Sequence, residues 1–192
     1  MAYSKKIIDM LNSKCQQSNN TTPRRRVQRE SGLQIQCVRW FQLQYPAFSR
    51  LLYHAKNESA SASRRVAIEA AAGVVPGVPD LILALPAKPA SPHAIEVNGV
   101  IYQTVIQYTS LGIELKYGKT NNQSTAQREF QAFYEAAGNK YLVIRSLDEF
   151  ITAVNDYMAH VPEEILAKVR KVYHSDANTD ANKKRLQSII NQ

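Results

Sequence analysis

A five-residue segment, Gly112-Ile113-Glu114-Leu115-Lys116, alternates apolar and charged side chains and constrains the fold more than any other part of the sequence. Successive side chains of a β-strand point to opposite faces, so Ile113 and Leu115 share one face, and Glu114 and Lys116 share the other. A second apolar run, residues 81–85, begins directly after Asp80 and has the composition of a buried strand. Together the two segments predict a sheet with one apolar face and a pair of opposite charges on the other.

Periodicity and turn residues indicate the remaining elements. Apolar positions at helical spacing predict helices over about residues 30–44, 126–137 and 147–158, and the Ala-rich residues 61–72 predict another helix, which Gly73 ends. Residues 51–54 and 141–144 have the composition of short strands, and Asn98-Gly99 between alternating residues predicts a hairpin. This order of elements predicts an α/β fold with one mixed central β-sheet flanked by helices.

Charge divides the chain into regions. Residues 1–65 contain 12 basic and 3 acidic side chains, a net charge of +9, although the net charge of the whole chain is +8. We expect residues 1–29 to form a basic flexible arm, because they are polar and carry the cluster Arg24, Arg25, Arg26 and Arg29. Residues 30–160 are the predicted globular domain, with an insertion at about 86–107, and residues 161–192 are expected to form a C-terminal helix and a polar tail.

The charge and the cysteine content restrict the partners and the compartment. Concentrated positive charge favours polyanions, since neutralising phosphates releases condensed counterions, so nucleic acid is the predicted partner; a charged face that only aids solubility is the alternative. Cys15 and Cys37 have neither CxxC spacing nor a neighbouring His cluster, which supports neither a zinc site nor a disulfide framework. No run approaches the roughly 18 apolar residues of a membrane helix. We therefore expect a soluble, cytoplasmic protein without a membrane partner.

Asp80, Glu114 and Lys116 are the candidate catalytic residues. Phosphodiester hydrolysis at neutral pH needs a hard cation that neutralises developing charge and lowers the pKa of an attacking water, and such cations prefer carboxylate oxygens. Asp80 begins one predicted strand and Glu114 lies within another, so a sheet that pairs these strands could bring both carboxylates to one end. The ammonium of Lys116 would then face the same site and balance charge on the scissile phosphate.

Three segments, Gly77-Val78-Pro79-Asp80, Ile113-Glu114-Leu115-Lys116 and Ser124-Thr125-Ala126-Gln127, together with the opening helix that carries Glu30 and Gln34, resemble the virus-type replication-repair nuclease (VRR-NUC) family of the PD-(D/E)xK superfamily. The resemblance covers about residues 30–158. It implies a restriction-endonuclease-like core that binds Mg²⁺ or Mn²⁺ through Asp80, Glu114 and the backbone carbonyl of Leu115, with Glu30 assisting. Gln127 and Gln34 would line the cleft near water or phosphate. The insertion between Leu85 and Gly112 is longer than the link expected of the family.

By the same resemblance, the chain is expected to be a metal-dependent endonuclease that hydrolyses DNA phosphodiester bonds in replication or repair, on branched DNA such as a Holliday junction. The residues assigned to nucleic-acid binding are basic or polar: Arg24, Arg25, Arg26, Arg29, Gln34, Arg64, Arg65 and Lys119. One catalytic set cuts one strand, and a four-way junction is nearly twofold symmetric, so we expect a homodimer.

The sequence leaves alternatives open. Glu114 and Lys116 could form a solvated strand face, Asp80 could be a turn residue, and Gln127 and Glu30 could be ordinary first-turn residues of their helices. His54, beside an apolar strand, would by default be structural. For the whole chain, the alternatives are a sequence-specific restriction-type endonuclease and a non-catalytic nucleic-acid-binding module that kept the fold.

Overall fold

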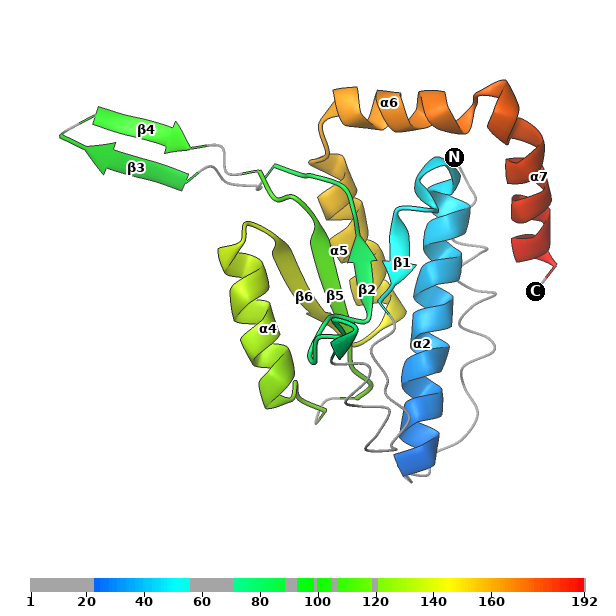
Figure 1. Cartoon of the computed structure of the whole chain (residues 1–192), viewed down its shortest axis with the longest axis horizontal. Coiled ribbons are helices and arrows are strands. Elements are labelled where there is room, and N and C mark those ends of the chain that lie inside the picture. The colour runs from blue at the N-terminus through cyan, green and yellow to red at the C-terminus, as the bar shows by residue number, and fades with distance from the viewer. Residues whose placement is uncertain are drawn as a thin grey trace.

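The computed structural model describes residues 23–55, 71–88, 93–98, 100–104, 107–118 and 121–191 (Figure 1). Its helices are α2 (Pro23–Gln44), α4 (Thr125–Ala136), α5 (Leu147–Ala159), α6 (Glu163–Tyr173) and α7 (Asp176–Ile190), with the short 3-10 helix η1 (Pro46–Phe48). Its strands are β1 (Leu52–His54), β2 (Leu81–Leu83), β3 (His93–Val97), β4 (Val100–Thr104), β5 (Leu111–Leu115) and β6 (Lys140–Ile144). The predicted helix at 61–72 lies almost entirely outside the described residues.

Four strands form one mixed sheet in the order β1-β2-β5-β6. Strands β1 and β2, and β2 and β5, pair antiparallel, whereas β5 and β6 are parallel and are joined through helix α4. A parallel pair needs such a crossover, because its second strand must begin at the same end as the first. The predicted α/β fold, a mixed sheet flanked by helices, is confirmed (Figure 1).

The two faces of β5 are packed differently. Ile113 and Leu115 belong to the main hydrophobic core, in which Trp40 of α2 meets Phe150 of α5 edge to face with ring centroids 5.9 Å apart. Gly112, the residue before Ile113, faces α4, since a Cβ placed on it would lie 3.0 Å from the ring of Tyr134. Glu114 lies on the same face as Gly112, since side chains alternate along a strand. Burial of the Ile113 and Leu115 face therefore directs Glu114 towards α4.

Helix α2 begins at Pro23, seven residues before the helix expected from apolar spacing. Proline favours the first helical position, because its fixed φ suits a helix and its missing N–H has no partner there in any case. Residues 23–29 therefore have helical backbone, contrary to the flexible arm predicted for them. The placement of their side chains, including those of Arg24, Arg25, Arg26 and Arg29, lies outside what the structure describes.

The C-terminal region contains two helices, where the sequence predicted one helix and a polar tail. Helix α7 contacts both α2 and α6, and it buries Ile189. The side chain of Asn182, also buried, donates a hydrogen bond to the backbone carbonyl of Tyr173 at 2.9 Å and so ties α7 to the end of α6. The segment is too polar for a clear apolar periodicity, which explains why the sequence did not indicate α7.

The predicted hairpin is confirmed: β3 and β4 pair antiparallel from His93↔Thr104 to Val97↔Val100. Asn98 follows β3 with a φ of 55°, a left-handed conformation that asparagine tolerates in tight turns. The hairpin extends away from the four-stranded sheet (Figure 1). None of the helices in the described part of the chain is both long and apolar enough to cross a membrane.

Candidate active site

The candidate site lies where β2 begins and β5 ends. The antiparallel register pairs Leu81 with Ile113, which places Asp80 opposite Glu114 at this end of the sheet. The backbone N–H of Leu115 donates a hydrogen bond to Oδ2 of Asp80 at 2.7 Å, so the Asp80 carboxyl is turned across the strand towards β5. The sheet thus brings together two acidic side chains that are 34 positions apart in the sequence.

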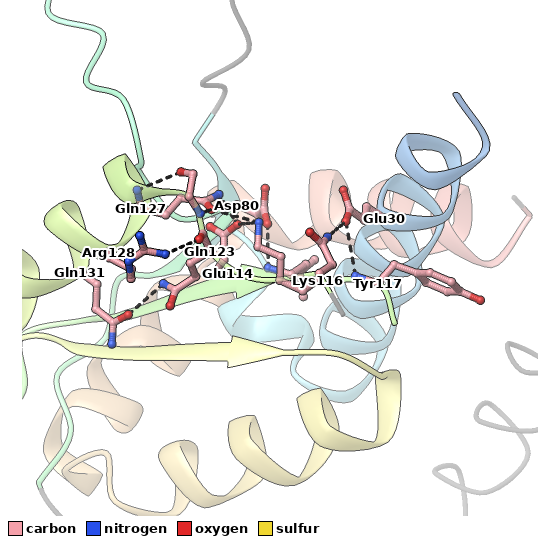
Figure 2. Close-up of polar contacts among 12 residues, drawn as sticks. Glu30, Asp80, Glu114, Lys116, Tyr117, Gln123, Gln127, Arg128 and Gln131 are labelled. Carbon is pink, nitrogen blue, oxygen red and sulfur yellow. Dashed lines mark hydrogen bonds and ion pairs between the residues drawn. The ribbon is translucent and has the colours of Figure 1, made fainter. Parts of the chain in front are cut away.

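Glu114 and Lys116 form a buried ion pair on the α4 side of the sheet (Figure 2). Nζ of Lys116 is 2.8 Å from Oε1 of Glu114, and the two residues are 8% and 1% exposed. The hydroxyl of Tyr141, on β6, donates to the other oxygen, Oε2, at 3.4 Å. A solvated strand face would leave both charges in water, so this alternative interpretation is wrong.

Gln127 connects this ion pair to the start of α4. Its Nε2 donates to Oε1 of Glu114 at 2.5 Å, and its Oε1 accepts from Nζ of Lys116 at 3.1 Å (Figure 2). Oε1 also accepts from the backbone N–H of Ser124 at 2.8 Å, and Oγ of Ser124 accepts from the backbone N–H of Gln127 at 3.2 Å. This reciprocal pair is a capping box, which stabilises a helix N-terminus. Gln127 therefore both caps α4 and holds Glu114 and Lys116 in place.

The loop before Asp80 packs directly against the same helix turn. Gly77 has a φ of 85°, and a Cβ added there would overlap the backbone carbonyl of Ala126 and lie 2.9 Å from the backbone nitrogen of Gln127. Glycine satisfies both requirements, the left-handed conformation and the close backbone approach. The Gly77 loop and α4 are thus fitted to each other on one side of the site.

This fit gives a prediction with a matched control. Gly73→Ala and Gly77→Ala both place a side chain at a positive φ, 87° and 85°, but Gly73 has open space around it. We expect Gly77→Ala to lower the free energy of unfolding by about 1–3 kcal/mol more than Gly73→Ala does, because its Cβ must displace backbone. Urea unfolding of the two variants measures the difference. Equal losses would show that the loop does not rest on α4 in solution.

The two carboxyl groups have unusual protonation equilibria. Burial, followed by the nearby charge of Asp80, raises the pKa of Glu114 to about 7, against the opposing effect of Lys116. Burial also raises the pKa of Asp80, although the hydrogen bond from Leu115 and the charge of Lys116 oppose the shift. Two partly desolvated carboxylates that repel each other are stabilised by a cation between them. The donor set therefore fits a divalent metal ion.

A cleft of about 520 Å³ opens at this site. The predicted residues that line it are Glu30, Gln34, Asp80, Glu114, Leu115, Lys116 and Gln127, and His54 and Ser124 line it as well. The structure thus gathers the predicted catalytic residues and Gln34 in one cleft. Arg64, Arg65 and Lys119 lie outside the described residues.

Glu30 lines the same cleft from helix α2. Its Oε1 accepts hydrogen bonds from the side-chain amide of Asn121 and, at 3.4 Å, from the backbone N–H of Tyr117 (Figure 2). Within the described ranges, no three His, Cys, Asp or Glu side chains group closely enough to hold a metal ion. Asp80, Glu114 and a backbone carbonyl such as that of Leu115 could hold a metal ion. Glu30 ties α2 to Tyr117 and Asn121, and its predicted role beside the metal stays a prediction.

Several residues of the site escaped the sequence analysis. Tyr141 contacts Glu114 from β6, and Asn121 contacts Glu30. The guanidinium of Arg145 donates to the backbone carbonyls of Gly118 and Asn121 at 2.6 and 2.8 Å, and so ties these two residues to the end of β6. A signal existed for Ser124, since Ser-x-x-Gln before an apolar helical pattern is the signature of a capping box. The other contacts join distant parts of the chain and leave no local pattern.

Comparison with known proteins supports the fold. No family model matches the sequence, and neither does any curated protein. A solved structure described as a "VRR_NUC domain protein" matches with a TM-score of 0.52 and 21% sequence identity, over 69% of this chain and 89% of that one. This chain has a VRR_NUC-like fold. At this identity the likeness concerns the fold, which agrees with the resemblance seen in the sequence motifs.

Proposed function

We propose that the protein is a divalent-metal-dependent endonuclease that hydrolyses phosphodiester bonds of DNA. The observation that carries the proposal is the convergence of Asp80, Glu114 and Lys116 in one cleft of a VRR_NUC-like fold. Two carboxylates and an ammonium suit phosphoryl chemistry, in which negative charge on the phosphate must be neutralised and a water must be activated.

Mg²⁺, or Mn²⁺ in its place, is the cation that this donor set suits, because both prefer oxygen ligands. Asp80 and Glu114 would hold it together with the backbone carbonyl of Leu115. When bound, such an ion lowers the pKa of an attacking water and neutralises charge that develops on the phosphate. Lys116 would contact the scissile phosphate, while Gln127 keeps its ammonium beside Glu114.

The nucleic-acid contacts are proposed for the first two turns of α2. Glu30 of this helix lines the cleft, and Arg24, Arg25, Arg26 and Arg29 precede it on the same helix. At a rise of about 1.5 Å per residue, these residues lie within roughly 9 Å of Glu30 along the helix axis. This short distance along the helix supports the proposal that the positive segment at the start of α2 binds DNA phosphates.

Replacing Arg24, Arg25 and Arg26 together by alanine is expected to weaken DNA binding and to flatten its salt dependence. Each lost phosphate contact lowers the slope of log K against log salt by about 0.9 for duplex DNA. Fluorescence anisotropy of a labelled duplex at several salt concentrations measures both quantities. An unchanged slope would mean that this part of α2 does not touch DNA.

The preferred substrate, the biological role and the oligomeric state are proposals too. We propose branched DNA as the preferred substrate, with a role in replication or repair, and a homodimer whose two sites cut opposing strands of a junction. A cytoplasmic location stays a prediction. Light scattering over a concentration series, with and without junction DNA, tests the dimer. A persistent monomer would favour a nicking or flap-cutting enzyme.

The experiment that tests the function is a cleavage panel. Duplex, flap, splayed and four-way DNA substrates are incubated with the protein and Mg²⁺ or Mn²⁺, and with chelator as a control. We expect metal-dependent cleavage, strongest on a branched substrate. Cleavage that follows a base sequence would identify a restriction-type enzyme. Binding without cleavage of any substrate would identify a non-catalytic module.

A further inference from the structure

The edge strand β1 brings His54 to the candidate active site. In the register of the sheet His54 pairs with Leu81, the residue directly after Asp80, and its side chain is exposed and lines the cleft. The strand order β1-β2-β5 places His54 on one side of Asp80 and Glu114 on the other. His54 therefore lies beside Asp80, on the side away from Glu114.

A hydrogen bond fixes which nitrogen of the ring carries the proton. Nδ1 of His54 is 2.7 Å from the backbone carbonyl oxygen of Asp80. A carbonyl oxygen can only accept, so Nδ1 must be protonated and must donate. In the neutral ring, Nε2 then has a lone pair and is a hydrogen-bond acceptor. Within the described part of the chain, Nε2 makes no hydrogen bond to protein.

Several acceptor atoms of this cleft are already engaged in hydrogen bonds. Lys116 has no acceptor atom, and Oε1 of Gln127 already accepts from Lys116 and from Ser124. Oε1 of Glu114 accepts from Lys116 and Gln127, and one oxygen of Asp80 accepts from Leu115. The remaining oxygens of Asp80 and Glu114 are the ones a cation would occupy, and Glu30 already accepts from Asn121 and Tyr117. A water that attacks phosphorus must point a lone pair at it and direct its hydrogens to acceptors elsewhere.

We propose that His54 is a further catalytic residue, whose Nε2 accepts a hydrogen bond from the attacking water and so orients it towards the phosphorus. The inference rests on the proposed nuclease function. The backbone carbonyl of Asp80 fixes the ring orientation, so the acceptor is already in place before substrate binds.

Two substitutions separate this role from a structural one. His54→Asn keeps an N–H donor near the position of Nδ1, for the Asp80 carbonyl, and removes Nε2. His54→Gln reaches towards the position of Nε2 and supplies an amide there. We expect His54→Asn to lower kcat on DNA by about 100-fold with KM nearly unchanged, and His54→Gln to recover part of kcat. Binding of Mn²⁺, followed by calorimetry without DNA, should be the same in both variants and in the wild type.

An independent measurement concerns the ring itself. In protein labelled with ¹⁵N at histidine, nuclear magnetic resonance at alkaline pH should show a protonated Nδ1 and an unprotonated Nε2 for His54, and this signal should vanish in His54→Asn. The opposite tautomer would overturn the inference, because Nε2 would then be a donor.

The outcomes of the kinetic test are also distinct. If the wild type cuts DNA and His54→Asn cuts at the same rate, His54 serves only to hold β1 against Asp80 and the inference is wrong. A parallel loss of Mn²⁺ affinity in His54→Asn would likewise overturn it, since the ring would then act through the metal site. A wild type that cuts no DNA in the cleavage panel overturns the nuclease proposal itself, and the inference with it.

Discussion

Alanine at Asp80, Glu114 or Lys116 is expected to lower cleavage to below about a thousandth of the wild-type rate. Asp80→Ala and Glu114→Ala each remove one of the two carboxylates that would hold the cation. Lys116→Ala removes the ammonium and leaves the nearly fully buried Glu114 without its ion-pair partner. Initial rates on the best substrate of the cleavage panel, with Mg²⁺ and with Mn²⁺, measure the effect. DNA binding should fall far less, because phosphate contacts outside the site supply most of the affinity.

The matched control is Asp156→Ala on α5. Asp156 is also an ion-paired carboxylate, 3.7 Å from Nζ of Lys140, but its side chain is 52% exposed and it does not line the cleft. Exposed ion pairs contribute little to stability, so this variant should keep both fold and activity. Circular dichroism of all four variants checks that the fold is retained. Full activity of Asp80→Ala, or of the wild type in chelator, would contradict the metal mechanism.

The sequence predicted those parts of the site that depend on local pattern. Alternation along β5 was sufficient to place Glu114 and Lys116 on one face, since the apolar Ile113 and Leu115 had to face the core. The position of Asp80 followed from the apolar run of residues 81–85 that begins directly after it. The strand order was not predictable from these patterns, although it is what places Asp80 beside Glu114.

Contacts that join distant segments were beyond local reasoning. Tyr141 reaches Glu114 because it pairs with Gly112 on the neighbouring strand. Arg145 follows Ile144, the partner of Leu115, and so meets the backbone of Gly118 just after β5. Sequence periodicity cannot predict such contacts, because they depend on the order and register of the strands. The unpredicted start of α2 and the unpredicted α7 have a different cause: both are polar segments, which show no apolar periodicity that would indicate a helix.

The second large effect is a dependence of the stability of the folded protein on pH and on a bound metal ion. Burial and the charge of Asp80 raise the pKa of Glu114 from its ordinary value to about 7, and burial also raises that of Asp80. The folded protein therefore holds protons that the unfolded chain has already released above about pH 4.5. The contribution of these two groups to the stability of the metal-free protein therefore falls as pH rises through this window to about pH 7, and the part from Glu114 is on the order of 3 kcal/mol.

A bound divalent cation reverses this linkage, because it favours the ionised carboxylates and binds the folded state. Urea unfolding at pH 5 and pH 8, in chelator and in Mn²⁺, measures both effects. We expect Mn²⁺ to stabilise the protein strongly at pH 8 and little at pH 5. Glu114→Gln is the control: it keeps nearly the same volume and cannot ionise, so in chelator its stability should fall less between the two pH values. If the stability of Glu114→Gln in chelator depends on pH in the same way as that of the wild type, Glu114 ionises normally in the folded protein. The desolvation of the site, which makes a cation fit there, would then be disproved.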